Sequence, residues 1–208
     1  MAAAAPDCAP APSPSPAPAL ALWSAINVAA LALAAFRVPL SAGYSQPAEL
    51  LAPQVVLVTQ VAAAGMLFPM LTRTTATAVC AVASVFPFAA AAAFVGAKGQ
   101  PATLAAAVFV ASWVATLAVG NRILRTPAAR MLGVALANLL TIGEPVLHYL
   151  GQEFARPPAA SIGPTLHVLA ILDGRWGKVG GWIPVAAVLG AAITVKVTRK
   201  CTRADAAT

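Results

Sequence analysis

Five polar residues recur at helical spacing within an apolar stretch of the chain. They are Asn138, Thr141, Glu144, His148 and Gln152, separated by steps of 3, 3, 4 and 4 residues. Residues three or four positions apart share one face of an α-helix, so the spacing predicts a polar stripe along a single helix. A carboxyl group and an imidazole one turn apart can share a proton or bind a cation. They can equally satisfy each other as a structural pair, and the pattern fits both interpretations.

The helix that carries this stripe is predicted to be bent at its acidic residue. Pro145 lacks a backbone donor and so frees the carbonyl of Thr141, and Gly143 loosens the same turn. The opposite face carries Leu136, Leu139, Leu140 and Leu147, which are suited to lipid, so the polar stripe is expected to point into the protein. Pro87, in a second apolar stretch, is a further hinge candidate. The alternative is that Pro87 is simply tolerated in a membrane helix and has no hinge function.

No metal, cofactor or catalytic machinery is predicted. His167 could approach His148 and join Glu144 in a metal-binding cluster, but the spacing of the three residues is not diagnostic. The three cysteines form no CxxC pair, and the chain contains no HExxH, GxSxG or GxxxxGK[ST] motif. We therefore predict a non-enzyme, with a membrane-embedded enzyme as the third of three function classes.

The composition indicates that the elements around this stripe lie in a membrane. Hydrophobic residues make up 60% of the 208 residues and charged residues only 9%, well outside the range of soluble domains. A bilayer accepts helices that are apolar all round because their backbone hydrogen bonds are closed internally. The net charge of +7 would suggest nucleic acid in a soluble protein, but the basic residues are spread over short loops, so no nucleic-acid partner is predicted.

The chain is predicted to be an all-α, polytopic transmembrane bundle of about six spans. Apolar runs of suitable length for crossing ~30 Å of hydrocarbon occupy residues 19–36, 53–71, 75–97, 102–120, 131–150 and 182–197. The third and fourth runs are expected to form an antiparallel hairpin. The run at 162–174 is too short to span, and a re-entrant or interfacial helix is expected there, opened by Pro164 and stopped at Gly174.

Three regions follow from this division of the chain. Residues 1–18 form a Pro/Ala-rich disordered tail, residues 19–198 the bundle, and residues 199–208 a basic cytoplasmic tail. The first span lacks a preceding basic region, which favours a retained anchor over a cleaved signal peptide.

The distribution of basic residues predicts the orientation in the cell membrane. One side would hold eight of the 13 Lys and Arg residues, namely Arg73, Arg122, Arg125, Arg130, Lys196, Arg199, Lys200 and Arg203. Cytoplasmic loops carry the basic excess, so both termini are predicted to be cytoplasmic. Trp23 and Tyr149 then lie near span ends, where interfacial aromatic residues are expected.

Six spans, cytoplasmic termini and an outer re-entrant element resemble, in topology alone, the permease halves of certain ABC exporters. The chain has no motif of that family, and its loop TRTT, residues 72–75, is short for docking an ATPase. The leading hypothesis is a permease-like component of a transport system, without an ATPase of its own. The alternative is a non-catalytic membrane scaffold or assembly subunit. The expected partners are the lipid bilayer and either other membrane subunits or a second copy of the chain.

Overall fold

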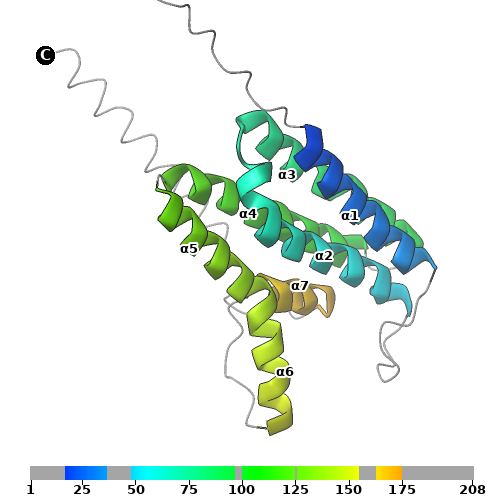
Figure 1. The fold of residues 1–208 in the computed structure, drawn as a ribbon. Helices are drawn as coiled ribbons and strands as arrows, with labels where there is room; N and C mark the ends of the chain where they lie inside the picture. The colour runs from blue at the N-terminus through cyan, green and yellow to red at the C-terminus, as the bar shows by residue number, and fades with distance from the viewer. Residues whose placement is uncertain (1–16, 37–47, 97–99, 125, 155–162, 175–208) are drawn as a thin grey trace, which may run out of the picture.

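The computed structural model describes residues 17–36, 48–96, 100–124, 126–154 and 163–174 (Figure 1). All the regular elements in these ranges are helices. The four helices of the N-terminal part are α1 (Ala17–Ala35), α2 (Ala48–Leu71), α3 (Thr75–Gly96) and α4 (Gln100–Ile123). They are followed by α5 (Pro127–Asn138), the π-helix η1 (Leu139–Gly143), α6 (Glu144–Phe154) and α7 (Pro164–Leu172). The predicted all-α class is confirmed.

Five stretches in the described ranges are long and apolar enough to cross a membrane. They are Ala17–Ala35, Ala52–Leu71, Thr75–Gly96, Pro101–Ile123 and Pro127–Leu150. Each matches one of the first five predicted spans to within a few residues. The predicted sixth span, 182–197, lies outside the described residues, as do residues 1–16 and the basic tail. The chain is a multi-pass membrane protein.

Threonine residues fix the starts of two helices. Thr74 caps α3, because its hydroxyl accepts from Thr77 N while Thr74 N donates back to the Thr77 hydroxyl, at 3.1 and 3.2 Å. This is the reciprocal pattern of a capping box. Thr126 caps α5 by accepting from Ala129 N, and Pro127 occupies the first turn, where no backbone donor is needed.

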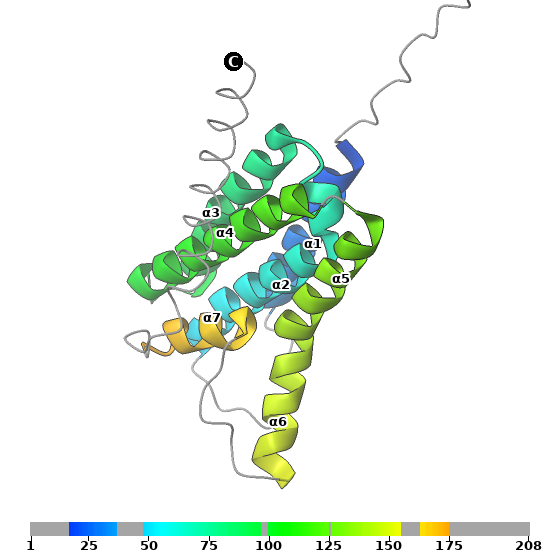
Figure 2. The same ribbon diagram turned by 90° about the vertical axis from the view of Figure 1, so that its left-hand side faces the viewer.

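The helices α2 and α4 lie at the centre of the bundle. The helix α2 packs against α1, α3, α4, α5 and α7, and α4 packs against α2, α3 and α7. The neighbouring helices α3 and α4 lie side by side (Figure 2), which confirms the predicted hairpin. Alanine dominates the buried positions between these helices, so their backbones approach closely, as packing in lipid requires.

Trp23 is not an interfacial residue, and that prediction is wrong. Its side chain is fully buried, and its Nε1 donates to Ser84 Oγ of α3 at 2.8 Å. A span-end tryptophan can serve either the interface or the core, because its ring is apolar and needs only one hydrogen-bond acceptor. Here α3 supplies that acceptor. Tyr149, by contrast, is exposed.

The helix α7 confirms the predicted short helix, for which a re-entrant or interfacial position was expected. It begins at Pro164, ends at Leu172, and is followed by Gly174 with φ +74°, a conformation that glycine adopts readily. Most of its residues are buried, and it packs against α2 and α4. Nine residues reach only ~14 Å, so α7 does not span, and protein surrounds its backbone as non-spanning backbone at membrane depth requires.

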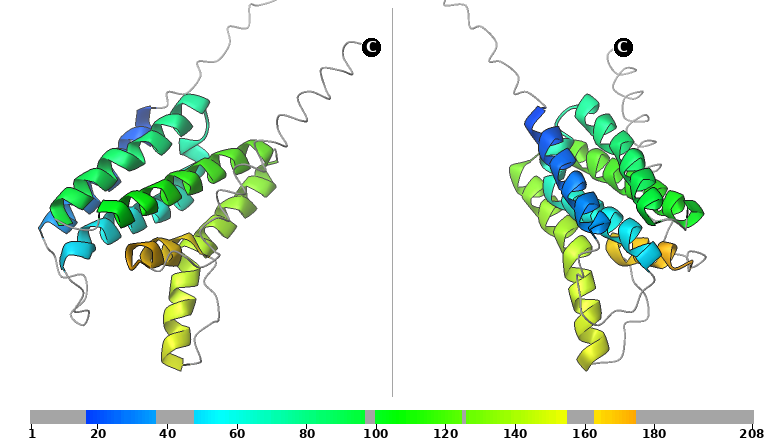
Figure 3. Two further views of the ribbon diagram at one scale, coloured as in Figure 1. Left: turned by 180° about the vertical axis from the view of Figure 1, so that it is seen from behind. Right: turned by 90° about the vertical axis from the view of Figure 1, so that its right-hand side faces the viewer.

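The fifth span lies at the edge of the bundle, and its second half projects away from it. Figure 3 shows α6 extending beyond α7 and the other helices. The four leucines predicted to face lipid are all exposed, namely Leu136, Leu139, Leu140 and Leu147. Thr141, on the opposite face, is buried. The predicted orientation of the stripe is therefore confirmed at these positions.

Candidate functional site

A π-helical turn interrupts the fifth span at the acidic residue. The N–H of Glu144 donates to the carbonyl of Leu139, five residues earlier, and Gly143 is the last residue of the turn. Pro145 follows at once and has no N–H to offer. The axes of α5 and α6 run in different directions (Figure 1). The predicted bend at Glu144 is confirmed, and the π turn is its local form.

The carbonyl that Pro145 leaves free finds a donor on α7. Thr165 Oγ1 donates a short hydrogen bond to the Thr141 carbonyl. The hydroxyl of Thr141 itself donates to the Ala137 carbonyl at 2.8 Å. On α2, a Cβ at Gly65 would lie 3.0 Å from Thr141 Oγ1, so only a very small residue allows this approach. Thr141 is thus held where three helical segments meet.

The carboxyl group of Glu144 lies against the N-terminal end of α7. Its Oε2 atom is buried, and a Cβ placed on Gly163 would overlap it. Gly163 is the N-cap of α7 and offers no side chain of its own. The N-terminal end of a helix carries partial positive charge from its unpaired N–H groups, so an acidic side chain there is stabilising. The carboxyl group of Glu144 therefore lies where the partial positive charge of α7 is concentrated.

His167 lies one turn further along α7 and is buried. Its ring is tilted against Phe109 of α4, with 4.9 Å between the ring centroids. Its Nε2 is buried and has no hydrogen-bond partner among the described residues. Burial lowers the pKa of this imidazole, and the nearby charge of Glu144 partly opposes that shift. His167 and Glu144 thus lie close enough to interact electrostatically.

The two central helices, which both pack against α7, carry further buried polar groups. Gln60 of α2 is fully buried, and neither of its amide atoms is hydrogen-bonded within the described ranges. On α4, Thr103 Oγ1 and Trp113 Nε1 are likewise buried without a partner there, and Trp113 lies one turn beyond Phe109. Unsatisfied polar groups are costly at membrane depth, which makes this region the candidate functional site.

The structure brings together only part of the predicted stripe. Thr141, Glu144 and His167 converge at the start of α7. Asn138 is half-buried and donates to the Val134 carbonyl of its own helix at 2.8 Å. His148 is half-buried one turn beyond Glu144. The structure does not describe the side chain of Gln152.

The described residues do not form the alternative metal cluster, and α3 is continuous through Pro87. Within the described part of the chain, no three His, Cys, Asp or Glu side chains are placed to hold a metal ion. The alternative cluster of Glu144, His148 and His167 is therefore not formed. The helix α3 continues from Thr75 to Gly96 through Pro87, whose side chain is exposed. A hinge function for Pro87 stays a prediction.

Sequence reasoning missed Gly163, Thr165 and Phe109 as members of the site. The sequence contained one indication of Thr165. The carbonyl freed by Pro145 needs a donor, and Thr165 lies in the first turn of the short apolar helix predicted nearby. Gln60 lies in the second predicted span, and its side chain is fully buried. Its burial depends on which neighbours surround α2, which is not a property of the local sequence.

The chain was compared with family models, curated proteins and solved structures. No family model, no curated protein and no solved structure matches it.

Proposed function

We propose that the chain is a permease-like component of a membrane transport system, without an ATPase of its own, in which α7 and the bent fifth span form the gate. One observation supports this most directly. The carboxyl group of Glu144, at the π turn of a spanning helix, lies against the N-terminal end of the non-spanning helix α7. A change at one side chain therefore acts on the contact between two helices.

The chemistry of this contact links ligand binding to helix movement. A carboxylate beside a helix N-terminus is stabilised by the helix dipole. A cation or a proton that reaches Glu144 competes for the same negative charge and weakens its attraction to α7. His167, on α7, supplies a further buried polar group close to Glu144. We therefore propose a small cation or a proton as the transported or coupling species.

The proposed location is the cell membrane, with both termini in the cytoplasm. Arg122, at the end of α4, donates to Thr75 Oγ1, at the start of α3, at 2.7 Å. The connections that carry Arg73, Arg122 and Arg130 therefore lie at one end of the bundle, as the positive-inside rule requires of cytoplasmic loops. Reporter fusions at the two termini test this orientation, and opposite locations for the two ends would contradict it.

The transport proposal is tested with purified protein in liposomes that contain a pH-sensitive dye. A potassium gradient with valinomycin drives protons or a test cation across the bilayer, and the rate is compared with that of empty liposomes. We expect Glu144→Gln to lower the rate at least about tenfold, since it removes about 1.4 kcal/mol or more of interaction at the gate. The matched control is Asp173→Asn, which removes an exposed carboxylate at the other end of α7. A wild-type rate equal to that of empty liposomes, or equal rates for Glu144→Gln and wild type, would contradict the proposal.

A scaffold or assembly subunit is the second candidate function, favoured by the exposed fifth span. Large apolar side chains such as Met131, Leu136 and Leu147 project outward along α5 and α6. Such a surface suits either lipid or another membrane subunit, including a second copy of the chain. The same variants separate the two candidates. If Glu144→Gln lowers protein abundance in the membrane while the liposomes show no flux, the scaffold function is supported.

A further inference from the structure

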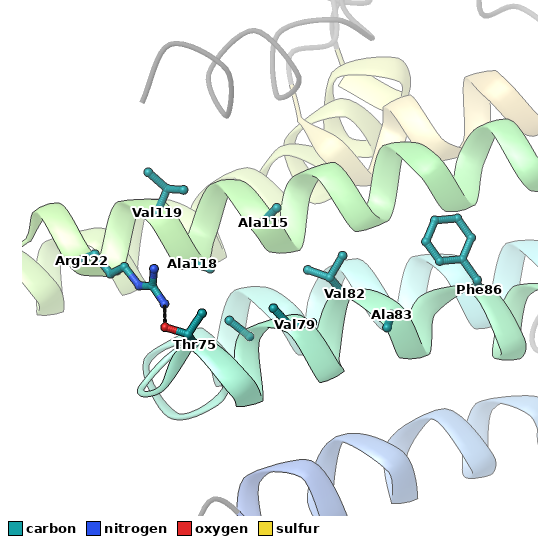
Figure 4. A pocket seen from close by; sticks show the side chains of 10 residues that line it. Thr75, Val79, Val82, Ala83, Phe86, Ala115, Ala118, Val119 and Arg122 are labelled. Carbon is teal, nitrogen blue, oxygen red and sulfur yellow. Dashed lines mark hydrogen bonds between the residues drawn. The ribbon is translucent and has the colours of Figure 1, made fainter. Parts of the chain in front are cut away.

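A groove runs along the outer surface between α3 and α4. It has a volume of about 590 Å³ and a lining that is almost entirely apolar. Figure 4 shows Val79, Val82 and Phe86 of α3 facing Ala115 and Val119 of α4 across it. The groove is separate from the candidate gate, because none of its lining residues belongs to α7 or the fifth span.

One end of the groove is positively charged. Arg122 lines it there and donates to Thr75 Oγ1 (Figure 4). A guanidinium has five N–H donors, so most of them stay available to an incoming anion. Arg73 and Arg130 are exposed at the same end, and the sequence contains no Asp or Glu between Glu49 and Glu144. The charge at this end is therefore not balanced by acidic residues of the surrounding segments.

The length of the groove fits one leaflet of a bilayer. From Thr75 to Phe86 the helix α3 rises by about 16 Å, and half of the hydrocarbon thickness is about 15 Å. The arginine lies at the loop end, where a headgroup would be, and the apolar lining extends from it toward the middle of the bundle. Anionic lipids are the abundant negatively charged groups at this depth.

We propose that this groove binds an anionic glycerophospholipid. The phosphate accepts charge-assisted hydrogen bonds from Arg122, and one acyl chain lies between α3 and α4 against Val82, Phe86 and Ala115. The apolar lining alone would accept any lipid, so the preference for a negative headgroup comes from Arg122 and its neighbouring arginines.

The test is native mass spectrometry of the full chain in detergent, at about 0.15 M salt so that long-range charge effects are screened. Dioleoyl-phosphatidylglycerol and dioleoyl-phosphatidylcholine are titrated separately and in competition. We expect the wild type to prefer phosphatidylglycerol and Arg122→Gln to weaken its binding about tenfold, since hydrogen bonds to a charged group are lost. The matched control is Arg73→Gln, which removes the same charge from the same end without touching the lining, and we expect it to change binding about twofold or less.

A second variant tests the groove rather than the charge. Ala115→Trp fills the apolar part and keeps Arg122, and we expect it to weaken phosphatidylglycerol binding at least about tenfold. Equal binding of the two lipids by the wild type would overturn the proposal, as would equal losses for Arg122→Gln and Arg73→Gln. Unchanged binding by Ala115→Trp would mean that the lipid lies elsewhere. If the wild type binds neither lipid and Ala115→Trp lowers the melting temperature, another part of the chain fills the groove, and the proposal is wrong.

Discussion

Gly163→Ala tests the contact between the fifth span and α7 most directly. The backbone of Gly163 has φ −74° and ψ 146°, which alanine adopts without strain. Replacing glycine by alanine at such a position normally stabilises a protein by about 0.4–1 kcal/mol, because the unfolded chain loses freedom. Any destabilisation by this variant therefore reports a contact made by the added methyl group and not the backbone.

The structure predicts such a contact with two groups. A Cβ added at Gly163 would overlap Glu144 Oε2 and would lie 2.6 Å from the Leu140 carbonyl oxygen. The side chain of Glu144 can rotate, but the carbonyl can move only with the helix. Overpacking of this kind costs about 1–3 kcal/mol. After the favourable backbone effect is subtracted, we expect a net loss of about 1–2 kcal/mol, or about 2–8 °C in melting temperature for a chain of this length.

The assay is thermal unfolding of the purified protein in detergent. Gly120→Ala is the matched control, because a Cβ at Gly120 meets no atom within 4 Å and the residue lies inside α4. We expect that variant to raise the melting temperature slightly, since alanine favours a helix over glycine by about 0.5–1 kcal/mol.

A double-mutant cycle assigns the loss to Glu144. In a Glu144→Ala background, Gly163→Ala is expected to cost less, because the overlapping carboxyl group is gone and only the Leu140 carbonyl remains. If Gly163→Ala melts at or above the wild-type temperature, the packing of α7 against the fifth span described above is wrong.

Three further predictions concern the contacts around the site and in the core. Thr165→Val removes the donor to the Thr141 carbonyl and should lower stability by about 1–3 kcal/mol. Thr165→Ser keeps a hydroxyl donor and should keep most of that stability. Equal melting temperatures for the two variants would contradict this. Burial lowers the pKa of His167 below 6.5, so the unfolded chain binds a proton there more readily than the folded protein does. The folded protein should therefore lose stability as the pH falls below about 6.5. His167→Phe should make the melting temperature less dependent on pH between about pH 8 and pH 5, and an unchanged dependence would contradict this. Trp23→Phe removes the hydrogen bond to Ser84, and we expect it to lower the free energy of unfolding by about 0.6 kcal/mol. Adding Ser84→Ala to this variant should cause no further loss.

The apolar elements could be predicted from the sequence because each depends on a local property. Length and hydropathy located the spans, and the pair Pro164 and Gly174 marked the two ends of α7. The exposed leucines of the fifth span followed from helical periodicity. Even the bend at Glu144 was predictable, because Pro145 removes a specific hydrogen bond.

The contacts between elements could not be predicted in the same way. Trp23 looked like an interfacial residue because the sequence does not show that Ser84 of α3 lies beside it. The pairing of Glu144 with His148, one turn along the same helix, stays a prediction, whereas residues of separate segments cannot be paired by counting. Gly163 and Thr165 became visible only when α7 was placed against the bend. The part of the site that joins separate segments thus depends on tertiary packing.

The π turn at Leu139–Gly143 also determines the direction in which the side chains of α6 point around the helix axis. A π turn contains one residue more than an α turn, and each residue of an α-helix advances the side-chain direction by about 100°. In an uninterrupted α-helix, Glu144 and His148 would therefore point about a quarter of a revolution away from their present directions. Deleting one residue within Leu139–Gly143 would convert the π turn into an α turn and leave the acid facing α7. With its present length, the chain needs the π turn to direct the carboxyl group toward the neighbouring helix and not toward the surrounding acyl chains.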